Sequence, residues 1–339
     1  MKFEILAPAG SQESLVAGVR CGADAVYLGG KVLNARRNAG NFNDAELERA
    51  VAYCHQRGVK VDPTLNTLCR DSEMEEAYAL IKKSLSYGVD AFIVQDLGVI
   101  QMIKSCFPGA KLHGSTQMSI VTPEGVHALK EMGISRAVLP RELTAEEIAE
   151  IREKTDLELE MFIHGALCMS VSGQCYLSSM LGQRSGNRGL CAQPCRLSFS
   201  ADNSKSFDLS LKDLSLIRQL SKIKQLGVIS LKIEGRMKRP EYIAAAVTAV
   251  KKAIDNEYSI KDEILLKSVF SRSGFTQGYF NNEMSREMFG IRQKEDVVAA
   301  NDVLKELSHL YDNENPLVPI DLKLECLRDN PVKLTASAL

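Results

Sequence analysis

The sequence predicts a (β/α)8 TIM-like barrel, an α/β fold in which eight parallel strands alternate with helices. Through residues 1–165 of the 339-residue chain, short apolar runs alternate with amphipathic stretches. The pattern repeats about every 25 to 30 residues, a length that suits one strand and one crossover helix. Seven such units are too many for a small open sheet, so an eighth strand is expected to close a barrel.

The apolar runs predict the barrel strands, because each run is short and is bounded by turn residues. Two of them share a phrase, since GADAVYLGG at residues 22–30 resembles GVDAFIVQD at residues 88–96. Both phrases suggest a helix end, a turn and a buried strand. The predicted strands span residues 3–10, 24–30, 59–67, 90–96, 110–117, 136–143, 157–165 and 227–235.

Capping residues delimit the helices between these strands. Ser11 and Thr144 are expected N-caps, Gly58 and Gly88 close helices, and Pro240 opens the last helix. The predicted helices span residues 11–22, a segment closed by Gly58, residues 72–88, a segment ending near Cys106, residues 122–133, the segment after Thr144, residues 212–226 and residues 240–257.

Residues 166–211 break the pattern, so the barrel of residues 1–257 is expected to carry a cysteine-bearing insertion between its seventh and eighth strands. Within it, a β-hairpin is predicted around DNSKS at residues 202–206. Residues 258–314 are expected to form peripheral helical and irregular structure. Residues 315–339 alternate apolar and polar side chains, which predicts the start of a truncated β-rich domain.

Composition narrows the classes of function. The net charge of −1 favours neither DNA nor a membrane as a partner, although a local basic patch is compatible with RNA. The first residues do not resemble a signal peptide, and no apolar run approaches the roughly 18 residues of a membrane helix. A cytoplasmic protein with reduced thiols is therefore expected.

Polar side chains gather where the predicted strands end, which is where barrel enzymes place their active sites. We expect four of these residues to take part in catalysis, namely His113, Gln117, His164 and Glu234. Basic or amide residues of the strand ends and of the loops expected on the same barrel face are suited to bind an anionic substrate such as RNA, and these are Arg36, Arg37, Asn66, Arg141, Arg188, Lys232, Arg236 and Lys238.

Four cysteines form the sharpest signal. Cys168, Cys175, Cys191 and Cys195 are separated by six, fifteen and three residues. Four thiolates can bind zinc or an iron–sulfur cluster. The spacing lacks the paired short knuckles of a zinc ribbon, and nearby glycines allow close backbone approach, so a cluster is favoured. Zinc, a catalytic thiol and an inert role stay open as alternatives.

Four segments carry a family resemblance. EMFIHGALCMSVSGQCYLS (160–178), NRGLCAQPCR (187–196), SLKIEGRMKRPEYIA (230–244) and LAPAGS (6–11) resemble signatures of the collagenase-like peptidase family U-32. The resemblance covers about residues 3–257 and implies several activities. Family members make 5-hydroxyuridine at the tRNA wobble position with prephenate implicated, hydroxylate a cytidine of large-subunit rRNA, or act in ubiquinone hydroxylation.

The resemblance also implies a 4Fe-4S cluster on Cys168, Cys175, Cys191 and Cys195. In some family members one ligand comes from elsewhere in the chain, so Cys195 is the ligand that the resemblance implies least firmly. The tail after residue 315 resembles the start of an extra domain in the rRNA-acting branch. Three hypotheses follow: an iron–sulfur-dependent RNA hydroxylase served by an unidentified electron donor, a peptidase, and a non-catalytic RNA-binding or scaffold protein.

Overall fold

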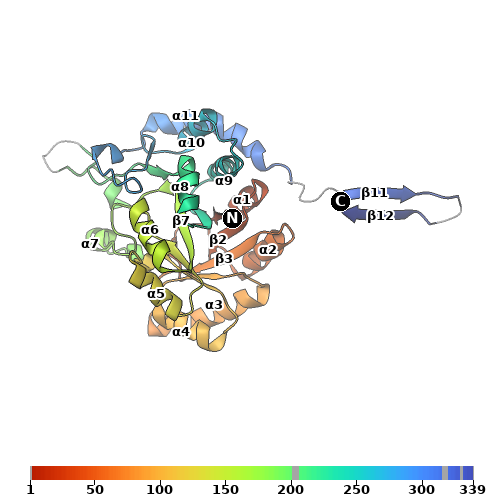
Figure 1. Cartoon of the computed structure of the whole chain (residues 1–339), viewed down its shortest axis with the longest axis horizontal. Helices are drawn as coiled ribbons and strands as arrows, with labels where there is room; N and C mark the ends of the chain where they lie inside the picture. The colour runs from red at the N-terminus through yellow and green to blue at the C-terminus, as the bar shows by residue number, and fades with distance from the viewer. Residues whose placement is uncertain (1, 201–205, 315–319, 329–330, 339) are drawn as a thin grey trace.

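A computed structural model describes residues 2–200, 206–314, 320–328 and 331–338. Its centre is a closed parallel barrel (Figure 1), in which each strand pairs with the next and β9 pairs with both β7 and β1. The barrel strands are β1 (Glu4–Ala9), β2 (Ala25–Gly29), β3 (Lys60–Leu65), β4 (Phe92–Val94), β5 (Leu112–Gly114), β6 (Arg136–Leu139), β7 (Glu158–Ala166) and β9 (Ser230–Ile233). The predicted fold class is confirmed.

Helices surround this barrel, and their ends match the predicted caps. The hydroxyls of Ser11 and Thr144 accept hydrogen bonds from the first turns of α1 and α6, and Gly88 ends α3 in the left-handed region at φ 91°. The helices of the barrel are α1 (Gln12–Arg20), α2 (Asp44–His55), α3 (Met74–Tyr87), α4 (Leu97–Cys106), α5 (Pro123–Glu131), α6 (Ala145–Lys154), α8 (Leu220–Gln225) and α9 (Pro240–Ile254).

Two kinds of interior result from this arrangement. The main apolar core lies between strands and helices, because the crossover helices cover the outer face of the parallel barrel. Inside the barrel, a small cluster of Leu6, Ala25, Tyr27 and Ile93 is fully separate from that core. The barrel interior also contains polar side chains, among them the buried ion pair of Glu160 and Lys232.

The insertion leaves and rejoins the barrel at one place. The short strand β8 (Asp213–Ser215) pairs antiparallel with the end of β7, so Ala166 lies opposite Asp213. The predicted helix 212–226 is therefore wrong at its start, because residues 213–215 satisfy their backbone by pairing with β7. A 3-10 turn and α8 follow this strand. The insertion also contains α7 (Leu177–Gly182), and the hairpin turn predicted at DNSKS lies outside the described residues, apart from Ser206.

The segment after the barrel is helical and then β-stranded. Helices α10 (Ile260–Val269) and α11 (Lys294–Ser308) lie near α9, and the two-residue strand β10 (Phe275–Thr276) pairs with β8. Strands β11 (Ile320–Glu325) and β12 (Lys333–Ala338) form an antiparallel pair that projects from the barrel (Figure 1). Most of the DNP turn predicted between them lies outside the described residues.

One face of the β11–β12 pair is apolar and open to solvent. Ile320, Leu322 and Leu324 alternate along β11, and Leu334 lies opposite Leu324 on β12. These side chains are each at least 60% exposed.

Among the described residues, no helix is both long and apolar enough to cross a membrane.

Candidate active site at the barrel mouth

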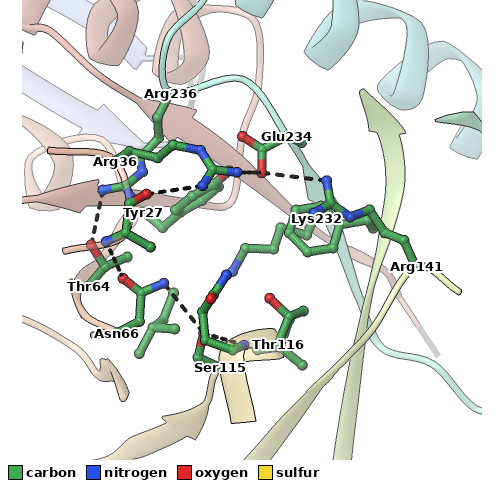
Figure 2. Close-up of a pocket in the computed structure, with 15 residues that line it drawn as sticks. Tyr27, Arg36, Thr64, Asn66, Ser115, Thr116, Arg141, Lys232, Glu234 and Arg236 are labelled. Carbon is green, nitrogen blue, oxygen red and sulfur yellow. Dashed lines mark hydrogen bonds and ion pairs between the residues drawn. The ribbon is translucent and has the colours of Figure 1, made fainter. Parts of the chain in front are cut away.

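A polar pocket opens at the carboxyl ends of the barrel strands (Figure 2), where the fold places active sites. Seven predicted site residues line it, contributed by loops and strands far apart in the sequence: Arg36, Asn66, Gln117, Arg141, Lys232, Glu234 and Arg236. Sequence reasoning missed Tyr27 and Thr64, which also line the pocket. Both lie within strands on inward-facing positions, so the alternation of β2 and β3 was the available signal.

Glu234 is the acidic centre of the pocket. Its carboxylate lies 3.3 Å from the Arg36 guanidinium and 3.7 Å from that of Arg141 (Figure 2). Burial alone raises the pKa of Glu234, but Arg36, Arg141 and Arg236 outweigh burial and leave that pKa below its ordinary value. Glu234 is therefore ionised at neutral pH and holds two arginines at the mouth.

Arg236 reaches the pocket from the same loop, immediately after β9. Its guanidinium donates to the Thr64 hydroxyl at 3.0 Å, and burial lowers its pKa to about 10. The hydroxyl of Tyr27 donates to the carbonyl of Ile233 at 2.8 Å and fixes the wall beneath. Arg236 has no ion pair among the described residues, so its charge faces the pocket.

Asn66 shapes the opposite wall. Its side-chain carbonyl accepts from the backbone N–H of Ala35 at 3.0 Å, and its amide lies 3.4 Å from the Ser115 hydroxyl. Arg36 follows Ala35, so Asn66 holds in place the loop that carries Arg36. The side-chain carbonyl of Asn66 is thus engaged in positioning this loop, and the predicted role of Asn66 in substrate binding stays a prediction.

The charge of Lys232 is neutralised by a carboxylate buried in the barrel interior, and not by a group at the mouth. Its ammonium lies 2.8 Å from Glu160, which is fully buried and also lies 3.2 Å from Arg136. The Lys232 nitrogen also lies 4.3 Å from the centroid of the Tyr27 ring. The mouth itself therefore holds Arg36, Arg141 and Arg236 against Glu234, an excess of two positive charges that suits an anionic ligand.

His113 lies in the barrel interior and is not among the pocket-lining residues. Its Nδ1 is 3.6 Å from Asp62, and both side chains are buried. Burial lowers the pKa of His113 to about 3, and burial raises the pKa of Asp62 to about 8, with Glu160 and Glu4 adding to the latter. At neutral pH the histidine is uncharged and Asp62 carries a proton.

His164 points away from the mouth pocket into an aromatic layer. Its ring stacks on Tyr242 at 5.8 Å between centroids and meets Phe275 edge-on at 5.1 Å. The side chain is 1% exposed, and neither ring nitrogen has a hydrogen-bond partner. Burial lowers its pKa to about 3, and Lys238 contributes. The structure thus separates His164 from the pocket.

Three other predicted binding residues also lie outside the pocket. Arg188 donates to the carbonyl of Leu68 at 2.6 Å and pairs with Glu73, which ties the insertion to a barrel loop. Arg37 is exposed, and its backbone N–H donates to the carbonyl of Gly189 at 3.2 Å. Lys238 is part-exposed and lies over the ring of Phe270.

The four cysteines lie in one neighbourhood beside the mouth. Burial raises the pKa of the Cys195 thiol, and the charges of Cys168, Cys191 and Cys175 raise it further. Glu234 raises the pKa of Arg36 most, and Cys168 and Cys191 add to the effect. Cys175 and Cys191 both border Gly186, where an added Cβ would lie 3.6 Å from the Cys191 Cβ and 3.7 Å from the Cys175 carbonyl oxygen.

One of these thiols, Cys191, accepts hydrogen bonds of the kind that a metal-bound thiolate receives. The sulfur of Cys191 accepts from the backbone N–H of Gln193 at 3.3 Å and from the Ser178 hydroxyl at 3.8 Å, contacts that stabilise a ligand thiolate. In the described part of the chain, no three histidine, cysteine or acidic side chains are placed to hold a metal ion. In a four-iron cluster each cysteine binds a different iron, so the four thiols need not meet at one ion.

Two glycines seat the insertion on the barrel. Gly173 has φ +82°, and a Cβ there would lie 2.3 Å from the carbonyl oxygen of Gln117. Gly189 has φ +80°, and its Cβ would lie 2.4 Å from the carbonyl oxygen of Asn34. Only glycine permits such approaches at this backbone conformation. The cysteines are thereby held beside the loops that line the pocket.

The sequence is similar to a known protein family and to several named proteins. The profile described as peptidase family U32 matches residues 10–289. tRNA hydroxylation protein P1 of Bacillus subtilis is 38% identical over 75% of this chain and 63% of its own length. The 23S rRNA 5-hydroxycytidine C2501 synthase of Escherichia coli is 37% identical over 82% of this chain.

A third relative carries a different name. A protein named collagenase from Porphyromonas gingivalis is 34% identical over 82% of this chain and 73% of its own length. The matched part of this chain spans only 43% of the Escherichia coli synthase and 63% of the Bacillus subtilis protein.

Proposed function

This chain belongs to the peptidase U32 family, and we propose that it is an iron–sulfur-dependent enzyme that hydroxylates a pyrimidine of rRNA or tRNA. The observation that carries the proposal is the charge of the mouth pocket. Three arginines face one glutamate there, beside four cysteines on a segment seated against the same loops. The names of the hydroxylating relatives support RNA as the substrate.

The residues that line the pocket would have different roles, according to their chemistry. Arg141 and Arg36 are held by Glu234 and keep donor groups aimed at the pocket, where they would neutralise a phosphate or carboxylate. The amide side chain of Gln117 lines the same pocket and is suited to hydrogen-bond a pyrimidine edge. The rings of Tyr27 and Phe162 supply apolar surface beside these polar groups.

A 4Fe-4S cluster on Cys168, Cys175, Cys191 and Cys195 would supply electron transfer beside the pocket. The electron donor would reach it from the solvent side, because Cys168 and Cys191 are exposed. The positive excess also suits a carboxylate co-substrate such as prephenate, since Arg36, Arg141 and Arg236 offer three guanidinium groups.

The peptidase hypothesis requires a thiolate paired with a base. His164 is four residues before Cys168, but it is buried against Tyr242 and Phe275 without a partner at either nitrogen. Cys168 is exposed. The geometry therefore favours hydroxylation over cysteine-protease chemistry.

Nucleoside mass spectrometry tests the proposed reaction. In a strain lacking this gene, one hydroxylated pyrimidine of rRNA or tRNA should be replaced by the nucleoside lighter by one oxygen atom. Complementation with the wild-type gene should restore it, and complementation with Arg141→Gln should not. Unchanged nucleosides in all RNA fractions would overturn the proposal.

A second measurement tests the cofactor. Full-length protein purified without oxygen should contain iron and sulfide, and Cys191→Ser should lose both. Cys106→Ser is the matched control, because Cys106 is also exposed but lies at the end of α4, away from the insertion. Colourless wild-type protein without iron would remove the cluster from the proposal.

A further inference from the structure

A second group of cations surrounds Phe270, outside the mouth pocket. The Lys238 ammonium lies 2.7 Å from the centroid of the Phe270 ring. The guanidinium carbons of Arg292 and Arg272 lie 4.3 Å and 5.1 Å from the same centroid. We call Lys238, Arg272 and Arg292 with this ring the Phe270 cluster. Its members come from the loop after β9, the loop before β10 and the loop before α11.

The positive charge of the Phe270 cluster is only partly neutralised. Asp213 lies 2.6 Å from the Arg272 guanidinium and also accepts from the backbone N–H of Arg272 at 2.9 Å. Neither Lys238 nor Arg292 forms an ion pair with any carboxylate of the described residues. The Nε of Arg292 is buried and has no hydrogen-bond partner. The three cations of the cluster are thus accompanied by one carboxylate, Asp213, which is already paired with Arg272.

The aromatic ring does not replace the missing anion. A cation over an aromatic face gains about 0.5 to 2 kcal/mol, and a ring has two faces for three cations here. The pKa of Lys238 reflects this excess of positive charge. Burial lowers the pKa of Lys238 to about 7, and Arg272 and Arg292 contribute while Asp213 opposes them. Such a cluster is stabilised by an anion that brings at least two charges and several acceptor oxygens.

We propose that the Phe270 cluster binds a phosphate group, with Lys238 and Arg292 donating to its oxygens. Phe270, Lys238 and Arg292 are all part-exposed, so a ligand can reach them from solvent. A phosphate offers the charge and the oxygens that these two unpaired donors lack. The role extends the predicted substrate contact of Lys238 and adds Arg272 and Arg292, which the sequence did not nominate.

The position of the cluster indicates one source of the phosphate. Arg236 lines the mouth pocket, and Lys238 follows it by two residues across a turn in which the Lys238 N–H donates to the carbonyl of Gly235 at 2.8 Å. A chain with its base at the mouth would carry its backbone phosphates past this turn. This RNA source rests on the proposed function, whereas the phosphate site itself does not.

Thermal unfolding in the presence of inorganic phosphate tests the site. Phosphate should raise the unfolding temperature of the full-length protein above that in sodium chloride of equal ionic strength, because it binds only the folded state. Lys238→Gln and Arg292→Gln should each weaken phosphate affinity about tenfold, the effect of losing one charge-assisted hydrogen bond. Lys294→Gln, an exposed cation next to the cluster in sequence, should leave the shift unchanged.

The same variants separate binding from a structural role. Without phosphate, Lys238→Gln should unfold at the same or a higher temperature than wild type, because it removes an unpaired, part-buried charge. A fall in unfolding temperature for both variants, with the phosphate shift retained, would overturn the proposal. An equal phosphate shift in all four proteins would do so too.

Binding of an RNA oligonucleotide identifies the source. If the phosphate belongs to RNA, each variant should weaken binding and reduce the slope of log affinity against log salt by about one. If the variants lose the inorganic phosphate shift but bind RNA normally, the site stands and takes a free phosphate ester. If phosphate binds as expected but no RNA is hydroxylated in cells, the proposed function fails alone.

Discussion

Burial and neighbouring charges together decide which carboxyl groups inside the barrel are ionised. Asp62 is protonated at neutral pH because burial raises its pKa to about 8, whereas Glu160 is ionised because Lys232 and Arg136 hold it. Two buried carboxyl groups in one barrel therefore behave oppositely. The difference is their partners: two cations lie within 3.2 Å of Glu160, and a neutral histidine lies 3.6 Å from Asp62.

Asp62 makes the first prediction, which concerns pH. Between about pH 4 and pH 8 the folded state holds a proton on Asp62 that the unfolded chain releases, so Asp62 lowers stability as pH rises, by up to about 1.4 kcal/mol per pH unit. Asp62→Asn should therefore gain stability relative to wild type through this range and level off above pH 8. Urea unfolding at several pH values measures it. A difference that is flat or shrinks with pH would contradict the assignment.

Glu160 makes the second prediction, which concerns burial. Glu160→Gln leaves Lys232 buried without a carboxylate, whereas Arg136 keeps Glu4 at 2.6 Å, and it should cost about 3 to 5 kcal/mol. Glu150→Gln is the matched control, since its 2.8 Å ion pair with Lys154 has the same length as that of Glu160 with Lys232 but is exposed. It should cost less than about 1 kcal/mol. Equal losses in the two variants would contradict the role of burial.

At the scale of elements, the insertion is held on the barrel by close backbone approaches. Gly189→Ala should press a Cβ against Asn34 and separate the cysteines from the mouth, so the protein should lose the iron of the proposed cluster while the barrel stays folded. Gly182→Ala is the control, because a Cβ at Gly182 meets nothing within 4 Å. Iron content and far-ultraviolet circular dichroism measure both effects. Equal iron in the two variants would contradict this docking role.

The elements also show what the sequence could reveal. Strands, helices and caps of the barrel followed from local periodicity, which depends only on neighbours along the chain. The start of the predicted helix 212–226 failed, because Asp213 and Ser215 pair with β7, a contact that local pattern does not encode. His164 and Arg141 both follow from strand ends, yet only Arg141 faces the mouth. The register of β7 shifts between Phe162 and His164, and such a bulge changes the direction in which the following side chain points. The sequence pattern does not reveal this shift.

The chain as a whole joins a closed barrel to a projecting strand pair. In the described residues, β11 and β12 pair only with each other, whereas Glu314 pairs with Arg20 and Arg57 on the barrel. Truncation after Glu314 should therefore leave the unfolding temperature and the iron content unchanged. Truncation after Asp255 should lower both stability and phosphate binding, because it removes α10, Phe270 and α11. Calorimetry of the two truncations measures this difference, and a large loss in the first would contradict it.

The antiparallel pairing of Ala166 with Asp213 has a consequence for changes in the length of the cysteine segment. The two ends of the cysteine segment lie side by side, and β7 pairs directly with β9 without it. The entropy of closing a loop whose ends already meet grows only slowly with its length. Changes in the length of this segment should therefore cost the barrel little stability, because β7 and β9 pair without its help.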